Sequence, residues 1–158
     1  GRDFFGLFFK IRELELLHKS GIQHVDISSI SKSMIGRSAI NRHFKDMLAS
    51  VKSDVVIVAS SQNLERCVKL LKNFMPNFAR KGINARLYGP YNKNIVKKLQ
   101  NVQHIEYNPN STFLTIDGKE MAFLVSNDSA APDYEVAIWI DSPFFVNSVN
   151  ALFEGSLK

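Results

Sequence analysis

Histidine and cysteine, which supply many of the nucleophiles and metal ligands in proteins, are few and scattered in this chain of 158 residues. Cys67 is the only cysteine, so the chain holds neither a disulfide framework nor a pair of thiolates. The closest pair of candidate ligands is His104 with Glu106, and two side chains on one face of a strand explain it better than a metal site. We therefore predict no metal and no cofactor. The four histidines are His18, His24, His43 and His104.

Polar side chains that could bind a ligand follow the predicted strands. In α/β sheets, ligands bind beyond the carboxyl ends of the strands. Tyrosine faces there could stack on a sugar, and amides and hydroxyls could bind its hydroxyl groups. The competing interpretation is structural: Asp117-Gly118 would only form a turn, and the tyrosines would fill the edge of the sheet. The predicted pocket comprises Ser60, Ser61, Gln62, Tyr88, Tyr91, Asn110, Asp117 and Asn127.

The elements that must position these residues alternate between strand and helix in the first half of the chain. The apolar run at 54–60 is typical of a central strand covered on both faces. The spacing predicts a helix over 63–81, which Pro76 should kink or divide and which Gly82 should end. A strand at 83–88, a short helix at 94–100 and a strand at 103–107 follow.

An antiparallel pattern follows in the second half. Strands at 113–116 and 121–125 flank Asp117-Gly118-Lys119, a strong hairpin signal. A buried strand at 136–140 precedes a final helix, with Ser142 or Asp141 as its cap and Pro143 at its first position. The order predicts an α/β fold with a mixed sheet and helices on both faces.

The first 51 residues contain two predicted helices. Phe4 to Lys19 has helical apolar spacing, and a helix this apolar either packs against the body of the domain or pairs with a partner chain. Residues 22–35 are mixed, with Val25 and Ile27 alternating as in a strand; a second helix covers about 37–51. Residues 22–158 would form one globular domain. Because the chain begins at Gly1, we expect it to be a piece of a longer protein.

Composition narrows the class of protein. The formal net charge of +5 and the pI of about 9.4 permit a nucleic-acid partner without requiring one. No apolar run is long enough to span a bilayer, and no signal peptide is visible. With a single cysteine, these features predict a cytoplasmic protein.

The order of strands and helices resembles one half of the phospholipase D fold, and the sequence around the hairpin supports this resemblance. In that superfamily the segment carries His-x-Lys, then Asp after four residues, then Gly-Ser-x-Asn after six more. Asp117 and Asn127 agree with the pattern, whereas Asn110 and Thr112 stand at the His and Lys positions and Leu124-Val125 at Gly-Ser. The reaction needs an imidazole to attack phosphorus and a cation to hold its oxygens. The resemblance therefore implies a chain that is not an enzyme.

Residues 34–158 resemble the effector domain of TrmB-type archaeal transcriptional regulators. The resemblance implies a degenerate phospholipase-D-like sensor domain, preceded at residues 1–21 by a linker helix that pairs chains into a homodimer. It also implies a small polar metabolite or sugar as ligand, and DNA bound by a winged-helix domain before Gly1. It rests on the segments Met34–Ile40, Lys52–Ser60, Arg80–Leu87, Glu135–Pro143 and Ala151–Glu154.

Two alternatives remain open. Residues 27–44 can be written as a helix-turn-helix, with Ile30 in the first helix and Arg37, Asn41 and Arg42 facing outward from the second. The same sensor domain could also belong to another signalling protein, for example one with a kinase output.

Overall fold

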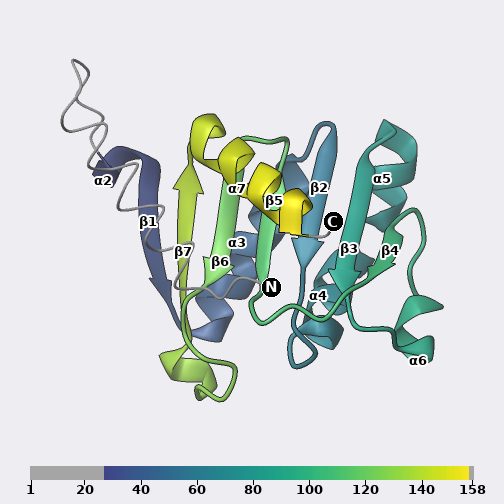
Figure 1. Ribbon diagram of the computed structural model, residues 1–158, viewed down its shortest axis with the longest axis horizontal. Coiled ribbons are helices and arrows are strands. Elements are labelled where there is room, and N and C mark those ends of the chain that lie inside the picture. The colour runs from purple at the N-terminus through teal and green to yellow at the C-terminus, as the bar shows by residue number, and fades with distance from the viewer. Residues whose placement is uncertain (1–26, 157–158) are drawn as a thin grey trace.

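The computed structural model describes residues 27–156 and shows a seven-stranded sheet in the order β1-β7-β6-β5-β2-β3-β4 (Figure 1). Its elements are α2 (Ile27–Ile30), β1 (Ser31–Ile35), α3 (Arg37–Ser50), β2 (Asp54–Val58), α4 (Leu64–Lys72), α5 (Met75–Lys81), β3 (Asn84–Gly89), α6 (Lys93–Val96), β4 (Gln103–Glu106), β5 (Phe113–Ile116), β6 (Glu120–Leu124), a 3-10 turn (Pro132–Tyr134), β7 (Val136–Asp141) and α7 (Pro143–Ser156).

The sheet is mixed, as the sequence predicts. β2, β3 and β4 run parallel, whereas β5, β6, β7 and β1 each pair antiparallel with their neighbour. The register places the carboxyl ends of β2 and β3, the start of β5 and the end of β6 at one end of the sheet. Residues that follow or precede these strands can therefore meet there.

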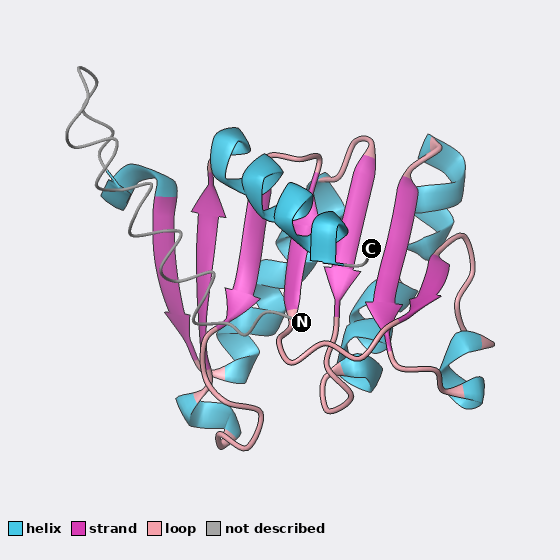
Figure 2. Cartoon of the chain, viewed as in Figure 1, coloured by secondary structure: helices cyan, strands magenta, loops and turns pink. Residues whose placement is uncertain are grey.

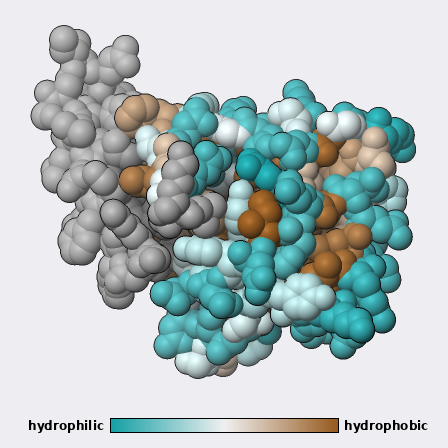
Figure 3. Space-filling model, turned by 45° about the vertical axis from the view of Figure 1, so that its right-hand side comes forward, coloured by the Kyte–Doolittle hydropathy of each residue, from teal (hydrophilic) through white to brown (hydrophobic). Residues whose placement is uncertain are grey.

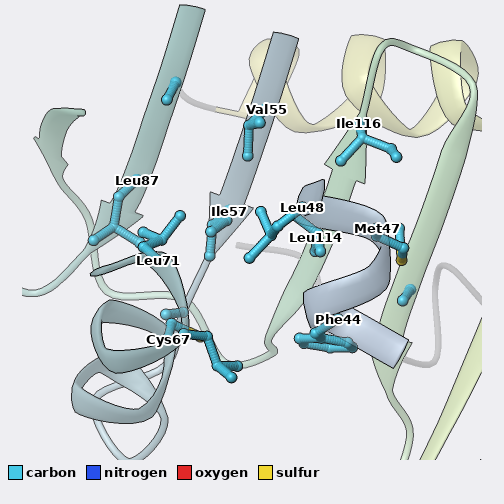
Figure 4. Packing of buried hydrophobic residues seen from close by; sticks show 14 of the residues in the cluster. Phe44, Met47, Leu48, Val55, Ile57, Cys67, Leu71, Leu87, Leu114 and Ile116 are labelled. Carbon is cyan, nitrogen blue, oxygen red and sulfur yellow. The ribbon is translucent and has the colours of Figure 1, made fainter. Parts of the chain in front are cut away.

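Helices cover both faces of the sheet (Figure 2). α3, α4 and α5 lie on one face. Between these helices and the sheet is a cluster of buried apolar side chains, which includes Phe44 of α3, Leu71 of α4 and Leu87 of β3 (Figure 4). α7 crosses the other face, where Val146 and Val149 pack on Phe123 of β6. The central strand β2 is therefore apolar on both faces, which explains its uninterrupted Val-Val-Ile-Val sequence.

Local sequence signals explain most of the element boundaries. Asp117 and Gly118 take φ values of 55° and 62° in the predicted hairpin turn, and residues 117–119 connect β5 to β6. After a break from α4, α5 begins at Met75 with Pro76 in its first turn, and Gly82 ends it in the left-handed conformation at φ 66°. Ser142 Oγ accepts a hydrogen bond from Phe145 N and caps α7.

The first strand differs from the prediction. Residues 31–35 form β1 and pair along their whole length with β7, whereas Ile27, expected in a strand, lies in the short helix α2. The helix-turn-helix interpretation of residues 27–44 is wrong, because a strand stands where its turn and the end of its first helix would be. The predicted helix at 4–19 and Val25 lie outside the described residues. Within residues 27–156, no helix is long and apolar enough to cross a bilayer.

Candidate functional site

Three side chains close the carboxyl end of β2. Thr112 Oγ1 accepts a hydrogen bond from Ser60 N at 3.0 Å and donates one to Ser60 Oγ at 3.2 Å. Asn63 Nδ2 donates to the same hydroxyl at 3.3 Å, and all three residues are buried. Thr112 just before β5 and Ser60 just after β2 thus join two antiparallel neighbours. A threonine here satisfies the buried backbone N–H of Ser60, which an apolar side chain could not do.

Beside this cluster, a carboxylate lies between two arginines. Glu135 is only 5% exposed, and its Oε1 lies 2.6 Å from Arg66 Nη2. Arg66 Nη1 donates to Glu135 Oε2 at 2.8 Å, and Arg37 Nη2 donates to the same oxygen at 3.1 Å. Both carboxylate oxygens are therefore engaged by guanidinium groups. A buried carboxylate needs such partners, because burial removes the water that would otherwise stabilise its charge.

Arg66 connects the ion pairs of Glu135 with the cluster at the end of β2. Its Nε donates to Asn41 Oδ1 at 2.8 Å, and its Nη1 lies 3.4 Å from Asn63 Oδ1. Asn63 Nδ2 also donates to Asp128 Oδ1 at 3.0 Å. We call the eight residues of this arrangement the polar network; they are Arg37, Asn41, Ser60, Asn63, Arg66, Thr112, Asp128 and Glu135. It ties α3, α4 and the ends of β2, β5 and β7 together.

Most of this network was not predicted from the sequence. Ser60 was among the predicted ligand residues, and Thr112 entered only through the phospholipase D pattern. Arg37 and Asn41 were named only as outward-facing residues of the helix-turn-helix alternative. The other six members come from four separate stretches of the chain, which the sequence did not relate to one another. The available signal was local: Asn63 and Arg66 are three residues apart on a predicted amphipathic helix, and Glu135 directly precedes a buried strand.

Five predicted ligand residues do lie at this end and are exposed, among them Ser61, which directly follows Ser60. Gln62 follows β2, Tyr91 follows β3, Asn110 precedes β5 and Asn127 follows β6. Asn127 Oδ1 accepts hydrogen bonds from the backbone N–H and the hydroxyl of Ser129, which fixes its loop. The topology thus brings these polar side chains to one end of the sheet, above the buried Ser60.

Tyr88 is at the same end but is not available for stacking. It is 5% exposed and points to the face covered by α7, where Phe153 meets it edge to face at 4.9 Å between ring centroids. The structure therefore agrees with the alternative interpretation for this residue, in which the ring fills the sheet.

Asp117 lies at the opposite end of the sheet, so its predicted place in the pocket is wrong. It accepts hydrogen bonds from the backbone N–H groups of Ser53 at 2.8 Å, Asp54 at 3.0 Å and Lys52 at 3.1 Å. β5 starts at the candidate site and runs away from it, which carries the hairpin turn to the far end. Partial burial favours a higher pKa for Asp117, but these N–H donors outweigh it and lower the pKa.

Asp117→Asn is expected to lower the free energy of unfolding by about 1–2 kcal/mol at neutral pH, because the N–H groups lose a charged acceptor. Asparagine tolerates the left-handed backbone here, so the turn is kept. Folding lowers the pKa of Asp117, so its carboxylate stabilises the fold fully above the pKa that it has in the unfolded chain. This stabilisation is lost as the pH falls from that value through the pKa of the folded state. Urea unfolding at neutral pH and near pH 3 should therefore show a difference that shrinks in acid. The exposed Asp46→Asn is the control, and an equal loss in both variants would contradict this role.

The seven-stranded mixed sheet with helices on both faces is a phospholipase-D-like α/β fold. TrmBL2, described as an archaeal chromatin protein, shares it with a TM-score of 0.63 and 16% identity over 95% of this chain and 60% of that one. NucT from Helicobacter pylori has a TM-score of 0.61 and 18% identity, with 80% of this chain and 94% of NucT covered. Nuc from Salmonella typhimurium, a phospholipase D family member, has a TM-score of 0.57 and 12% identity, covering 79% and 93%. No protein-family model and no curated protein sequence matches the chain.

Proposed function

We propose that this chain is a non-catalytic effector-sensing and dimerisation domain of a TrmB-type archaeal transcriptional regulator. The observation that carries the proposal is the state of the remnant active site. Thr112, at the position of the phospholipase D lysine, is 2% exposed and hydrogen-bonded to Ser60. Asn110, at the position of the nucleophilic histidine, has an amide that is a poor nucleophile. The end of the sheet that would perform catalysis is instead closed by the polar network.

The likeness to TrmBL2 supports the regulator assignment over the enzymatic one. It extends over 95% of this chain, whereas NucT and Nuc cover 80% and 79% of it. TrmBL2 is described as binding DNA by a novel mode, and this chain spans 60% of its length. In the proposal, a winged-helix domain outside this chain binds the operator, the protein works in the cytoplasm, and the present domain reports the ligand state.

The exposed residues above the network are the proposed ligand contacts. Gln62, Asn110 and Asn127 offer amide groups, and Tyr91, which is 61% exposed, offers an aromatic face. Such a set suits a small polar metabolite or a sugar. Asp128, next to Asn127, accepts a hydrogen bond from Asn63 of the polar network. A ligand that moves this loop would therefore also disturb the hydrogen bonds and ion pairs that connect α3, α4 and β7.

A thermal-shift screen with mono- and disaccharides tests the sensor role. A ligand that binds only the folded state raises the unfolding midpoint, by an amount that grows with its concentration. We expect the shift to be lost in Gln62→Ala/Asn110→Ala and kept in Asp117→Asn, whose side chain lies at the other end of the sheet. Loss in both variants, or no shift with any sugar, would contradict the proposed site.

Two companion measurements complete the test. The chain should hydrolyse neither bis-p-nitrophenyl phosphate nor DNA above the buffer rate, and sedimentation should show a dimer. Turnover that disappears in Asn110→Ala would restore the enzymatic interpretation. Sedimentation of a monomer at high protein concentration would contradict the proposed dimerisation.

A further inference from the structure

Charge is unevenly distributed along this chain. Residues 66–105 contain nine lysines and arginines and no aspartate or glutamate, whereas residues 117–141 contain six carboxylates and Lys119 as their only cation. The first range forms most of α4 and all of α5, β3, α6 and most of β4, and the second forms the hairpin turn, β6 and β7. The modest net charge of +5 therefore conceals a strongly basic stretch at residues 66–105.

Most of these cations are available at the surface. Arg66 belongs to the polar network, and Arg86 lies under α7, where its Nη2 is 3.8 Å from Asp54 Oδ1. The other seven side chains are exposed, and we call them the basic surface: Lys69, Lys72, Arg80, Lys81, Lys93, Lys97 and Lys98.

Little on the described part of the chain neutralises this surface. Lys69 pairs with Glu65 at 3.6 Å, and both side chains are largely exposed, so water screens the pair. Arg80 donates to the neutral amide of Asn77. The structure gives the remaining five no carboxylate partner among residues 27–156. Cations on rigid helices without local counter-charges produce a field that attracts an external polyanion.

The surface follows one edge of the molecule. α5 and α6 flank the edge formed by β3 and β4, one toward each end, and α4 lies on the adjoining face (Figure 1). In Figure 3, which brings this side forward, hydrophilic residues dominate the rim above and below a smaller hydrophobic area. The cations are thus spread over an extended front and do not converge on one small site.

We infer that the basic surface binds the phosphate backbone of duplex DNA directly, without reading bases. Cations spread over an extended front match a regular polyanion better than they match a single phosphate ligand. Insertion into a lipid surface needs exposed large apolar side chains, and single-stranded nucleic acid needs several stacking rings. Tyr91 is the only large apolar residue of 66–105 that is exposed. The inference adds a second DNA-binding surface to the proposed regulator, on the domain to which the proposed function gives only a sensing and dimerising role.

The test is fluorescence anisotropy of a labelled duplex of arbitrary sequence, titrated with the 158-residue chain at several salt concentrations. Non-specific binding with a Kd of about 10⁻⁴ to 10⁻⁶ M near physiological salt is expected, with log K falling linearly against log salt. Lys93→Gln/Lys97→Gln/Lys98→Gln should weaken binding. It should also reduce the slope by up to about 0.9 for each phosphate that is no longer neutralised. Lys72→Gln/Arg80→Gln/Lys81→Gln should act in the same direction.

The matched control is Lys32→Gln/Lys45→Gln/Lys119→Gln, which removes the same charge at exposed positions away from the basic surface. We expect it to keep the slope of the unsubstituted chain. Equal weakening by the control and the α6 variant would show that only net charge matters and would overturn the inference. Absence of duplex binding, tighter binding to single strands, or binding to phosphatidylserine vesicles in place of DNA would also overturn it. The assay contains no effector, so these outcomes leave the sensor proposal standing.

Discussion

Glu135→Ala is expected to lower the free energy of unfolding by about 3–5 kcal/mol, as removal of one partner from a buried ion pair does. The substitution leaves Arg66, whose side chain is 14% exposed, with its charge uncompensated inside the domain. Arg37 is 40% exposed and can turn toward water, so most of the loss is assigned to Arg66. The carboxylate connects α3 and α4 to the start of β7. We therefore expect the substitution to destabilise the whole domain and not one element alone.

Urea unfolding followed by circular dichroism measures this change. Glu65→Ala is the matched control, because Glu65 pairs with Lys69 on the exposed face of α4 and should contribute less than about 1 kcal/mol. Glu135→Ala/Arg66→Met should recover part of the stability, since it also removes the charge that Glu135→Ala leaves uncompensated. A loss below about 1 kcal/mol in Glu135→Ala would show that the network does not hold these elements together.

Phe123→Ala should lower the free energy of unfolding by about 3–5 kcal/mol, because the hydrophobic burial of the ring is lost and a cavity remains. Phe123 is 1% exposed and lies between the sheet and α7 in the cluster that includes Val146 and Val149. Among the described residues, α7 is the only helix on this face, so the cavity should also loosen the packing of α7 on the sheet. Hydrogen exchange of the α7 amides would report this local effect.

Phe144→Ala supplies the comparison, because it removes the same side chain from α7 itself at a position that is 58% exposed. Its effect on stability is expected within about 0.5 kcal/mol. Similar losses in the two variants would mean that Phe123 does not contribute through burial. The pair therefore separates the packing beneath α7 from the intrinsic stability of the helix.

The strongest sequence predictions concerned elements with unambiguous local patterns. The apolar run of β2, the Asp117-Gly118 turn and the Pro76 break each depend on backbone or burial preferences of a few adjacent residues, and the structure confirms all three. β1 was missed because Ser31–Ile35 is mostly polar. An edge strand leaves part of its surface in water and needs little apolar patterning, so its pairing with β7 had no local signal.

Asp117 shows where local reasoning about the site failed. Its turn chemistry was evident, and only strand direction decided at which end of the sheet the turn lies. An antiparallel strand of four residues separates Asp117 from Thr112, so a residue close in sequence to the candidate site is far from it in space.

By itself, the sequence determined the α/β class and the mixed sheet, because these depend on residue type and short-range order. The resemblance to the phospholipase D pattern added the prediction that Asn110 and Thr112 stand at its His and Lys positions. Only the tertiary structure decided that Glu135 lies between Arg37 and Arg66, and that Tyr88 is covered by α7. Those interactions join residues up to 98 positions apart, and the packing of helices on the sheet brings them together.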